Sequence, residues 1–228
     1  MSPARARPIP AREHLGAVLI DLDGTLVDRD AAVRAWLQTR GHGREAARFT
    51  RGRSLESLAA QLLRHHPGLA PSDSELAARI RAELPALIPR ERAILEALEQ
   101  LASSELVLAL VSNGGGRTQR AKLAAAGIDA ALFAAVLISG EHGLAKPDAR
   151  MFALALNELD LRPDHAIMIG DSPEHDIAGA AAAGLASCWI AHGRTYPRSS
   201  PAPSMVAPHF SGAVRRLLGL PAADLSST

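Results

Sequence analysis

The chain has 228 residues, enough for one large α/β domain or for one domain that carries a modest insertion. Its 25 Lys and Arg residues nearly balance its 24 Asp and Glu residues, and the basic side chains are scattered along the chain, which argues against nucleic acid as a partner. The longest uncharged segment, residues 177–191, is too short and too rich in Ala and Gly to span a membrane.

Two further features indicate a reducing compartment. The single cysteine, Cys188, has no partner for an internal disulfide. Residues 1–16 lack the apolar run that is typical of a secretory signal. We therefore expect a cytoplasmic protein.

Five short apolar runs, each bounded by residues such as Gly, Asp or Ser, have the length and composition of buried strands. Helix-like segments separate the later runs, at about residues 116–126, 148–160 and 174–183. This alternation predicts a parallel sheet with helices on both faces, the Rossmann-like α/β class. The predicted strands are residues 16–22, 106–112, 134–139, 165–170 and 185–191.

An insertion interrupts this rhythm after the first strand. About 80 residues separate the first two predicted strands, where a simple crossover needs only about a dozen. We predict a small α-helical cap domain at residues 29–88, inserted into a catalytic core that consists of residues 1–28 and 89–228. The helical segments within the insertion are residues 30–41, 54–66 and 72–84.

The remaining segments carry less signal. Residues 90–102 read as a helix that returns the chain to the core. From residue 194 onward, five prolines between residues 197 and 221 predict a loop-like tail. A short helix at residues 211–220 is expected near its end.

Two aspartates follow the first predicted strand. Asp21 and Asp23 are two residues apart, so their side chains would point into the same region beyond the strand's carboxyl end. In an open parallel sheet that edge is where ligands bind. Two carboxylates a few ångströms apart repel by roughly 4 kcal/mol at an effective dielectric constant of 20, so a divalent cation or a basic side chain is needed near them. Taken alone, an Asp-x-Asp pair is more typical of a capped turn.

Polar residues also end the next three strands. Ser112 and Asn113 precede a glycine turn at residues 114–116, whose N–H groups could face an anion. Lys146, one of only two lysines in the chain, stands before a proline after the third strand. Asp171 follows the fourth strand. Each has an ordinary explanation as a turn, loop or cap residue, but that explanation does not account for their convergence on one edge.

Four motifs therefore occur in order, each at a strand end. They are DLDGT at residues 21–25, the strand that ends in Ser112, KPD at 146–148 and GDSPEHDIAGA at 170–180. Together they resemble the four signature motifs of the haloacid dehalogenase superfamily, in the phosphoglycolate phosphatase-like subgroup with a helical cap after the first motif. The resemblance covers residues 16–193.

The resemblance implies a catalytic role for four residues. Asp21 would be the nucleophile that forms an aspartyl-phosphate. Asp23 would protonate the leaving oxygen and then activate water. Ser112 would hydrogen-bond the phosphoryl group, and Lys146 would neutralise the nucleophile and the phosphate together.

A metal and a phosphate site are implied in the same way. Mg²⁺ would be bound by Asp21, the backbone carbonyl of Asp23, and Asp171. Ser172 and Asp176 would support these ligands from the next layer of contacts. The residues expected to contact phosphate are Gly24, Thr25, Ser112, Asn113, Gly114 and Lys146.

Departures within the family favour phosphoryl transfer. The dehalogenases lack the second aspartate, which is present here as Asp23, and the phosphonate-cleaving members need a cap lysine, which residues 29–88 lack. We predict a Mg²⁺-dependent phosphatase that hydrolyses a small phosphate monoester through an aspartyl-phosphate. A sugar-phosphate mutase is the alternative, and a non-catalytic protein that binds a phosphorylated metabolite is a third hypothesis. The particular ester and the oligomeric state are left open.

Substrate choice is expected to depend on the cap. His42, Arg44, Arg51 and Arg53 form a basic stretch within it, and we predict that most of these side chains are solvated surface. Trp36 is expected to be a packing residue of a cap helix.

Overall fold

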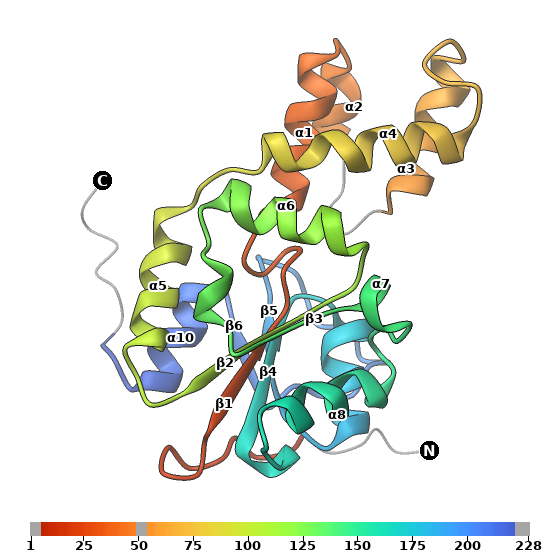
Figure 1. Cartoon of the computed structure of the whole chain (residues 1–228). Coiled ribbons are helices and arrows are strands. Elements are labelled where there is room, and N and C mark those ends of the chain that lie inside the picture. Colours follow the sequence, from red (N-terminus) through yellow and green to blue (C-terminus); the bar gives the residue numbers. More distant parts are fainter. Residues whose placement is uncertain (1–5, 49–53, 222–228) are drawn as a thin grey trace. The chain divides into compact units, whose positions relative to one another are not determined.

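The computed structural model describes residues 6–48 and 54–221, so Arg51 and Arg53 of the basic stretch lie outside the described residues. The described chain contains a sheet of six parallel strands in the order β3-β2-β1-β4-β5-β6 (Figure 1). The predicted Rossmann-like α/β class is thereby confirmed. The strands are β1 (Ala17–Ile20), β2 (Val107–Ser112), β3 (Ala135–Ile138), β4 (Ala166–Gly170), β5 (Ala186–Ile190) and β6 (Met205–Ala207).

The first five strands lie within the ranges predicted from their apolar runs. Every residue of β1, β4 and β5 is buried, as expected where both faces of a parallel sheet are covered. β6 was missed, because it has only three residues and follows a proline-rich stretch that predicted a loop. It is held as a strand by pairing with β5.

The order of the strands reverses at β1. The chain runs from β1 through β2 to β3 on one side and from β4 through β5 to β6 on the other, so β1 lies between β2 and β4. The carboxyl ends of strands around such a switch point are where ligands bind in open α/β sheets. The loops after β1, β2 and β4 are therefore the place to look for a site.

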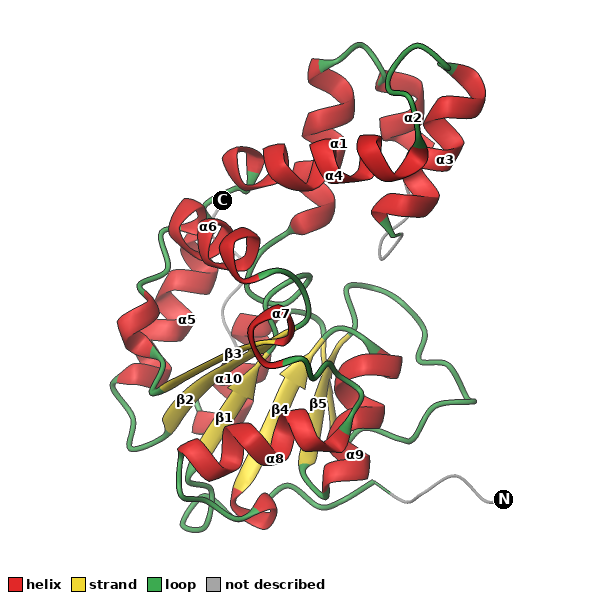
Figure 2. Ribbon diagram, turned by 45° about the vertical axis from the view of Figure 1, so that its right-hand side comes forward, coloured by secondary structure: helices red, strands yellow, loops and turns green. Residues whose placement is uncertain are grey.

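Helices cover both faces of this sheet. Figure 2 shows α8 and α9 on one face and α5 and α10 on the other. On the sheet face covered by α8, this helix contributes Met151, Phe152 and Ala155 to a buried cluster that includes Leu19 of β1 and Val111 of β2. The α-helices are α1 (Arg29–Thr39), α2 (Gly43–Arg48), α3 (Leu55–His65), α4 (Asp73–Glu83), α5 (Arg92–Ala102), α6 (Gly116–Ala126), α7 (Ser139–His142), α8 (Ala149–Glu158), α9 (Ala178–Ala183) and α10 (Phe210–Leu218).

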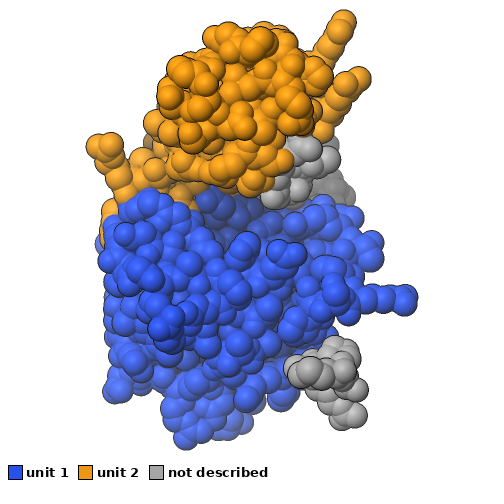
Figure 3. Space-filling view, turned by 90° about the vertical axis from the view of Figure 1, so that its right-hand side faces the viewer, with its two compact units in different colours: residues 1–26, 91–116, 129–228 blue, residues 27–90, 117–128 orange. Residues whose placement is uncertain are grey.

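The chain forms two compact units (Figure 3). The first contains the sheet and consists of residues 1–26, 91–116 and 129–228. The second is helical and consists of residues 27–90 together with 117–128, which include most of α6. The cap role of the inserted segment stays a prediction.

Local sequence explains the helices of the second unit. α1, α3 and α4 each follow an Asp or Ser whose side chain accepts a hydrogen bond from a backbone N–H of the first turn, which satisfies one of the free donors at a helix start. Trp36, Leu62, Leu76 and Ile80 are fully buried, which agrees with the expected packing role of Trp36. No helix within the described part of the chain is long and apolar enough to cross a membrane.

Candidate active site

The geometry of the first unit centres on Lys146. Its Nζ atom donates to Oδ1 of Asp21 at 2.6 Å and to Oδ1 of Asp176 at 2.7 Å. Asp21 follows β1, and Asp176 lies in a π-helical turn, Pro173–Ile177, that follows β4. All three side chains are buried, with Asp21 6% and Asp176 1% exposed. The structure thus holds one buried cation between two buried carboxylates.

Burial and charge act against each other in this triad. Burial raises the pKa of Asp21 well above its ordinary value, although the charge of Lys146 acts to lower it. Burial lowers the pKa of Lys146, but the carboxylates of Asp176 and Asp21 outweigh it and the pKa is raised. Lys146 is therefore a permanent cation at neutral pH.

The backbone of Lys146 is fixed by Asn113. The side-chain amide of Asn113 donates to the carbonyl of Lys146 at 2.8 Å and accepts from its N–H at 2.9 Å. The contact of Asn113 with phosphate stays a prediction. Its side chain joins the loop after β2 to the loop that carries the lysine, a positioning role that the sequence did not suggest.

Asp176 is oriented by its own turn. Its Oδ2 atom accepts from the backbone N–H of Ser172 at 2.9 Å, which leaves Oδ1 for Lys146. Ser172 caps the turn by accepting from the N–H of His175 at 3.1 Å. A Cβ atom at Gly170 would lie 2.2 Å from Oδ2 of Asp176, so only glycine fits at the end of β4. Of the two residues predicted to support the site, Asp176 therefore contacts Lys146 directly, and Ser172 contacts Asp176.

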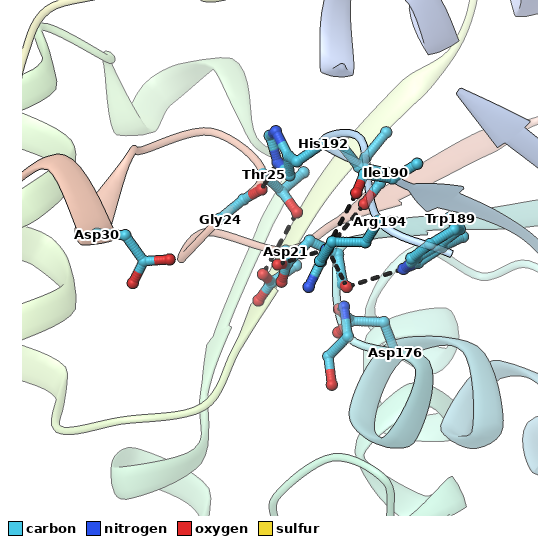
Figure 4. Close-up of polar contacts among 12 residues, drawn as sticks. Asp21, Gly24, Thr25, Asp30, Asp176, Trp189, Ile190, His192 and Arg194 are labelled. Atoms are coloured by element: carbon cyan, nitrogen blue, oxygen red, sulfur yellow. Dashed lines mark hydrogen bonds and ion pairs between the residues drawn. The ribbon is translucent and has the colours of Figure 1, made fainter. Parts of the chain in front are cut away.

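Asp171 supplies a third carboxylate. One oxygen each from Asp21, Asp171 and Asp176 lies within 4.8 Å of the others. Gly24 leaves room for Asp171, because it has a φ of +86° and an added Cβ would lie 2.7 Å from Cγ of Asp171. Arg194 pairs with Asp171 at 3.1 Å (Figure 4).

The other predicted residues differ in their burial and in whether they contact the residues described above. Ser112 is fully buried at the end of β2, and the hydroxyl of buried Thr25 lies 3.4 Å from Oδ2 of Asp21. Asp23 is partly exposed, and its carboxylate is outside the group of three. The N–H of Gly114, expected to face phosphate, donates to Oγ of Ser139 at 2.9 Å.

Three residues at the end of β5 or just after it were not predicted to belong to the site: Trp189 within β5, and His192 and Arg194 after it. Arg194 donates to the backbone carbonyls of Asp171 and Ile190, and Trp189 donates from Nε1 to that same carbonyl of Asp171 (Figure 4). Nε2 of His192 lies 2.6 Å from the carbonyl of Gly24. The available signal was position, because these residues end or follow the fifth strand on the edge that carries the other motifs.

The donor set fits Mg²⁺. Its members are carboxylate oxygens, which hard divalent cations prefer. Three carboxylates share the cations of Lys146 and Arg194, which leaves an excess of negative charge among these five side chains. Asp21 and Asp171 were predicted as ligands, and both belong to this group. The backbone carbonyl of Asp23 stays a prediction as a further donor. The two carboxylate oxygens of Asp176 already accept from Lys146 and from the N–H of Ser172.

Solved structures share this fold. A HAD-hydrolase of Bacillus subtilis, YfnB, bound to magnesium, matches with a TM-score of 0.71 and 20% identity, over 89% of this chain and 98% of that chain. The L-2-haloacid dehalogenase of Xanthobacter autotrophicus matches with a TM-score of 0.70 and 21% identity, over 91% of this chain and 100% of that chain. At these identities the likeness concerns the fold alone.

Sequence comparison identifies the family. The chain is 36% identical to the phosphoserine phosphatase of Thermus thermophilus over 181 residues, which cover 72% of this chain and 71% of the relative. It is 38% identical to the human N-acylneuraminate-9-phosphatase over 120 residues, which cover 52% of this chain and 45% of that relative. The family model for haloacid dehalogenase-like hydrolases matches residues 15–184. The chain therefore belongs to the haloacid dehalogenase-like hydrolase family.

Proposed function

We propose that the protein is a Mg²⁺-dependent phosphatase that hydrolyses a small phosphate monoester through an aspartyl-phosphate on Asp21. The observation that carries the proposal is the buried cation of Lys146, 2.6 Å from Asp21 at the carboxyl end of the central strand. An anionic nucleophile repels a phosphate dianion, and a fixed positive charge beside it offsets that repulsion. The phosphatases among the relatives support the same reaction class.

The reaction divides into two displacements. A carboxylate oxygen of Asp21 attacks phosphorus, the bond from phosphorus to the ester oxygen breaks, and Asp23 gives its proton to that oxygen. Asp23 then accepts a proton from water as the water oxygen attacks phosphorus. The bond from phosphorus to Asp21 breaks and releases inorganic phosphate. Lys146 stays charged throughout and stabilises the negative charge on the phosphoryl oxygens.

The metal site and the compartment belong to the same proposal. Asp21, Asp171 and the backbone carbonyl of Asp23 would hold Mg²⁺, which supplies Lewis-acid stabilisation of the phosphoryl oxygens when bound. Asp176 supports the site by holding Lys146. A cytoplasmic location is supported by the lone Cys188, which is buried.

Two other activities of the family are the alternatives, and Asp23 argues against the first of them, a dehalogenase. A dehalogenase needs no proton donor for a halide leaving group, whereas an alkoxide leaving group does, so a second aspartate two residues after the nucleophile favours the phosphatase. A sugar-phosphate mutase would use the same residues. It differs in returning the phosphoryl group to a sugar and releasing no phosphate.

Phosphate release from a panel of small phosphomonoesters tests the proposal. We expect release that requires Mg²⁺ and that falls by roughly 10³-fold or more in Asp21→Asn, because the nucleophile is lost while its volume is kept. Asp164→Asn is the matched control, since Asp164 forms a surface pair with Arg162.

Isomerisation of sugar phosphates is followed in the same samples. Conversion without free phosphate would show a mutase. Release that persists in Asp21→Asn would exclude Asp21 as the nucleophile. Release that is undiminished by a chelator would contradict the metal site.

A further inference from the structure

A second group of potential metal ligands lies within the helical unit. One ligand atom each from His42, Glu45 and His66 lies within 4.8 Å of the others. His42 precedes α2, Glu45 is in the first turn of α2, and His66 follows the last residue of α3. The three residues come from two helix ends that the insertion brings together.

Backbone hydrogen bonds fix the positions of the two histidines. The N–H of His42 donates to the carbonyl of Leu37 at 2.8 Å, and its carbonyl accepts from Ala46 at 3.0 Å. The N–H of His66 donates to the carbonyl of Leu62 at 2.8 Å. Side chains attached to a fixed backbone lose less entropy when a ligand binds.

His42 contradicts its expected place on the solvated surface. It is only 8% exposed, whereas its neighbour Arg44 is exposed as expected. Within the described residues, Nε2 of His42 is a buried side-chain nitrogen that has no hydrogen-bond partner. A buried polar atom without a hydrogen bond has lost its contacts with water and gained none, so a native structure that keeps one calls for an explanation.

Packing between the rings explains only part of the arrangement. The rings of His42 and His66 are tilted by 50° with centroids 4.6 Å apart, an ordinary aromatic contact. That contact gives Nε2 of His42 no partner. A bound cation would provide one, because neutral imidazole nitrogen is a ligand for transition metals.

His66 and Glu45 already have the spacing of two ligands of one metal ion. Nε2 of His66 lies 3.1 Å from Oε1 of Glu45. Two ligands about 2.0–2.1 Å from a tetrahedral zinc ion are about 3.3 Å apart.

We propose that His42, Glu45 and His66 form a binding site for Zn²⁺ or a similar borderline divalent cation in the helical unit. Two imidazoles and one carboxylate suit zinc, whereas Mg²⁺ prefers oxygen alone. Water would fill the fourth position. The site is independent of the hydrolytic reaction and of the carboxylates after β1 and β4.

Metal binding by the full chain tests this site directly. Zn²⁺ uptake is measured by equilibrium dialysis in excess Mg²⁺, which occupies the carboxylates of the first unit. We expect one Zn²⁺ per chain in the wild type. Co²⁺ offered in its place should give the visible absorption of a low-symmetry site with nitrogen ligands.

Variants then locate the ion. His42→Ala and His66→Gln should weaken Zn²⁺ binding by roughly 100-fold or more, since loss of a ligand exceeds the 10–100-fold effect of an outer contact. His65→Ala is the matched control, because His65 is exposed and adjacent to His66. Zn²⁺ should raise the unfolding temperature of the wild type and of His65→Ala, but not that of His42→Ala or His66→Gln. His66 is the less buried of the two ligands, so its variant remains informative if His42→Ala folds poorly.

Three outcomes would overturn the proposal. The first is no Zn²⁺ uptake by the wild type under these conditions. The second is uptake that is unchanged in both histidine variants. The third is uptake that is lost in Asp171→Asn and kept in His42→Ala, which would assign the ion to the carboxylates of the first unit.

Discussion

The two clusters of ionisable side chains differ in how their buried atoms are satisfied. At the carboxyl edge of the sheet, Lys146 is paired with both Asp21 and Asp176. In the helical unit, a ring nitrogen of His42 is buried without a hydrogen-bond partner among the described residues. Breaking the first cluster should destabilise the protein, whereas replacing the unsatisfied group with an apolar one should stabilise it.

The donor atoms of the two clusters differ as well. The first offers carboxylate oxygens and already contains cations, while the second offers two imidazoles and one carboxylate. A hard cation such as Mg²⁺ prefers the oxygen donors of the first cluster, whereas a borderline cation such as Zn²⁺ suits the imidazoles of the second. The two proposals therefore give one chain two sites for a divalent ion, with opposite selectivity.

The largest effect should come from Lys146→Met. Removing the lysine leaves two buried carboxylates without their cation, which should lower the free energy of unfolding by about 3–5 kcal/mol and abolish turnover. Urea denaturation at pH 7 measures the first effect. The double variant Lys146→Met, Asp176→Asn should recover part of the loss. If the single variant is as stable as the wild type, the triad contributes nothing to stability.

The same variant should be sensitive to pH. Burial already raises the pKa of Asp21, and loss of Lys146 removes the charge that opposes this rise. The folded variant then keeps a proton that the unfolded chain releases near pH 4. The stability of the variant should therefore fall as the pH rises above about 4, and its loss relative to the wild type should grow only above the raised pKa that Asp21 already has in the wild type. Urea midpoints from pH 4 to 8 check the sign.

Gly24→Ala should have the next largest effect. A residue with a side chain at this φ costs about 1–2 kcal/mol, and the new Cβ would also collide with Asp171. Gly219→Ala is the matched control, because Gly219 has a φ of +67° and an added Cβ there would meet no described atom within 4 Å. The excess loss in Gly24→Ala, and a higher Mg²⁺ concentration for half-maximal activity, would report the collision. Equal losses would show that Asp171 moves aside freely.

His42→Leu should act in the opposite direction. In chelator-treated protein we expect a gain of about 1 kcal/mol, because the buried unsatisfied nitrogen is replaced by apolar atoms. His65→Leu, at an exposed position, should change stability by less than about 0.5 kcal/mol. Thermal unfolding of both variants measures the difference. A clear loss of stability in His42→Leu would mean that the imidazole makes an interaction that the apolar side chain cannot replace.

Arg194→Gln should give the smallest effect. In the proposed site Arg194 would compete with Mg²⁺ for Asp171, and the Arg194–Asp171 pair is partly exposed to solvent, which weakens it. The Mg²⁺ concentration for half-maximal activity should therefore fall a few-fold. Arg162→Gln removes the ion pair of Arg162 with Asp164 on the surface, and it should leave the Mg²⁺ concentration for half-maximal activity unchanged. A rise in Arg194→Gln would indicate that the contacts of Arg194 with backbone carbonyls matter more than its charge.

Much of the fold and part of the site follow from sequence pattern. Short apolar runs that end in Asp, Ser or a Gly turn predicted β1 to β5, since a strand buried on both faces needs continuous apolar sequence. The gathering of Asp21, Asp171 and Lys146 follows in turn, because the carboxyl ends of parallel strands meet at one edge. Local pattern and chain direction are enough for both.

Tertiary structure alone decided the rest. Asn113 binds the backbone of Lys146, Arg194 pairs with Asp171, and His42 is buried beside His66, and each contact joins residues whose separation in the chain carries no periodic signal. β6 depends on pairing with β5 rather than on its own three residues. The sequence by itself determined β1 to β5 and where their polar ends gather, because local pattern encodes burial. Which polar atoms meet across loops, and which one is left without a partner, depends on packing that no local pattern encodes.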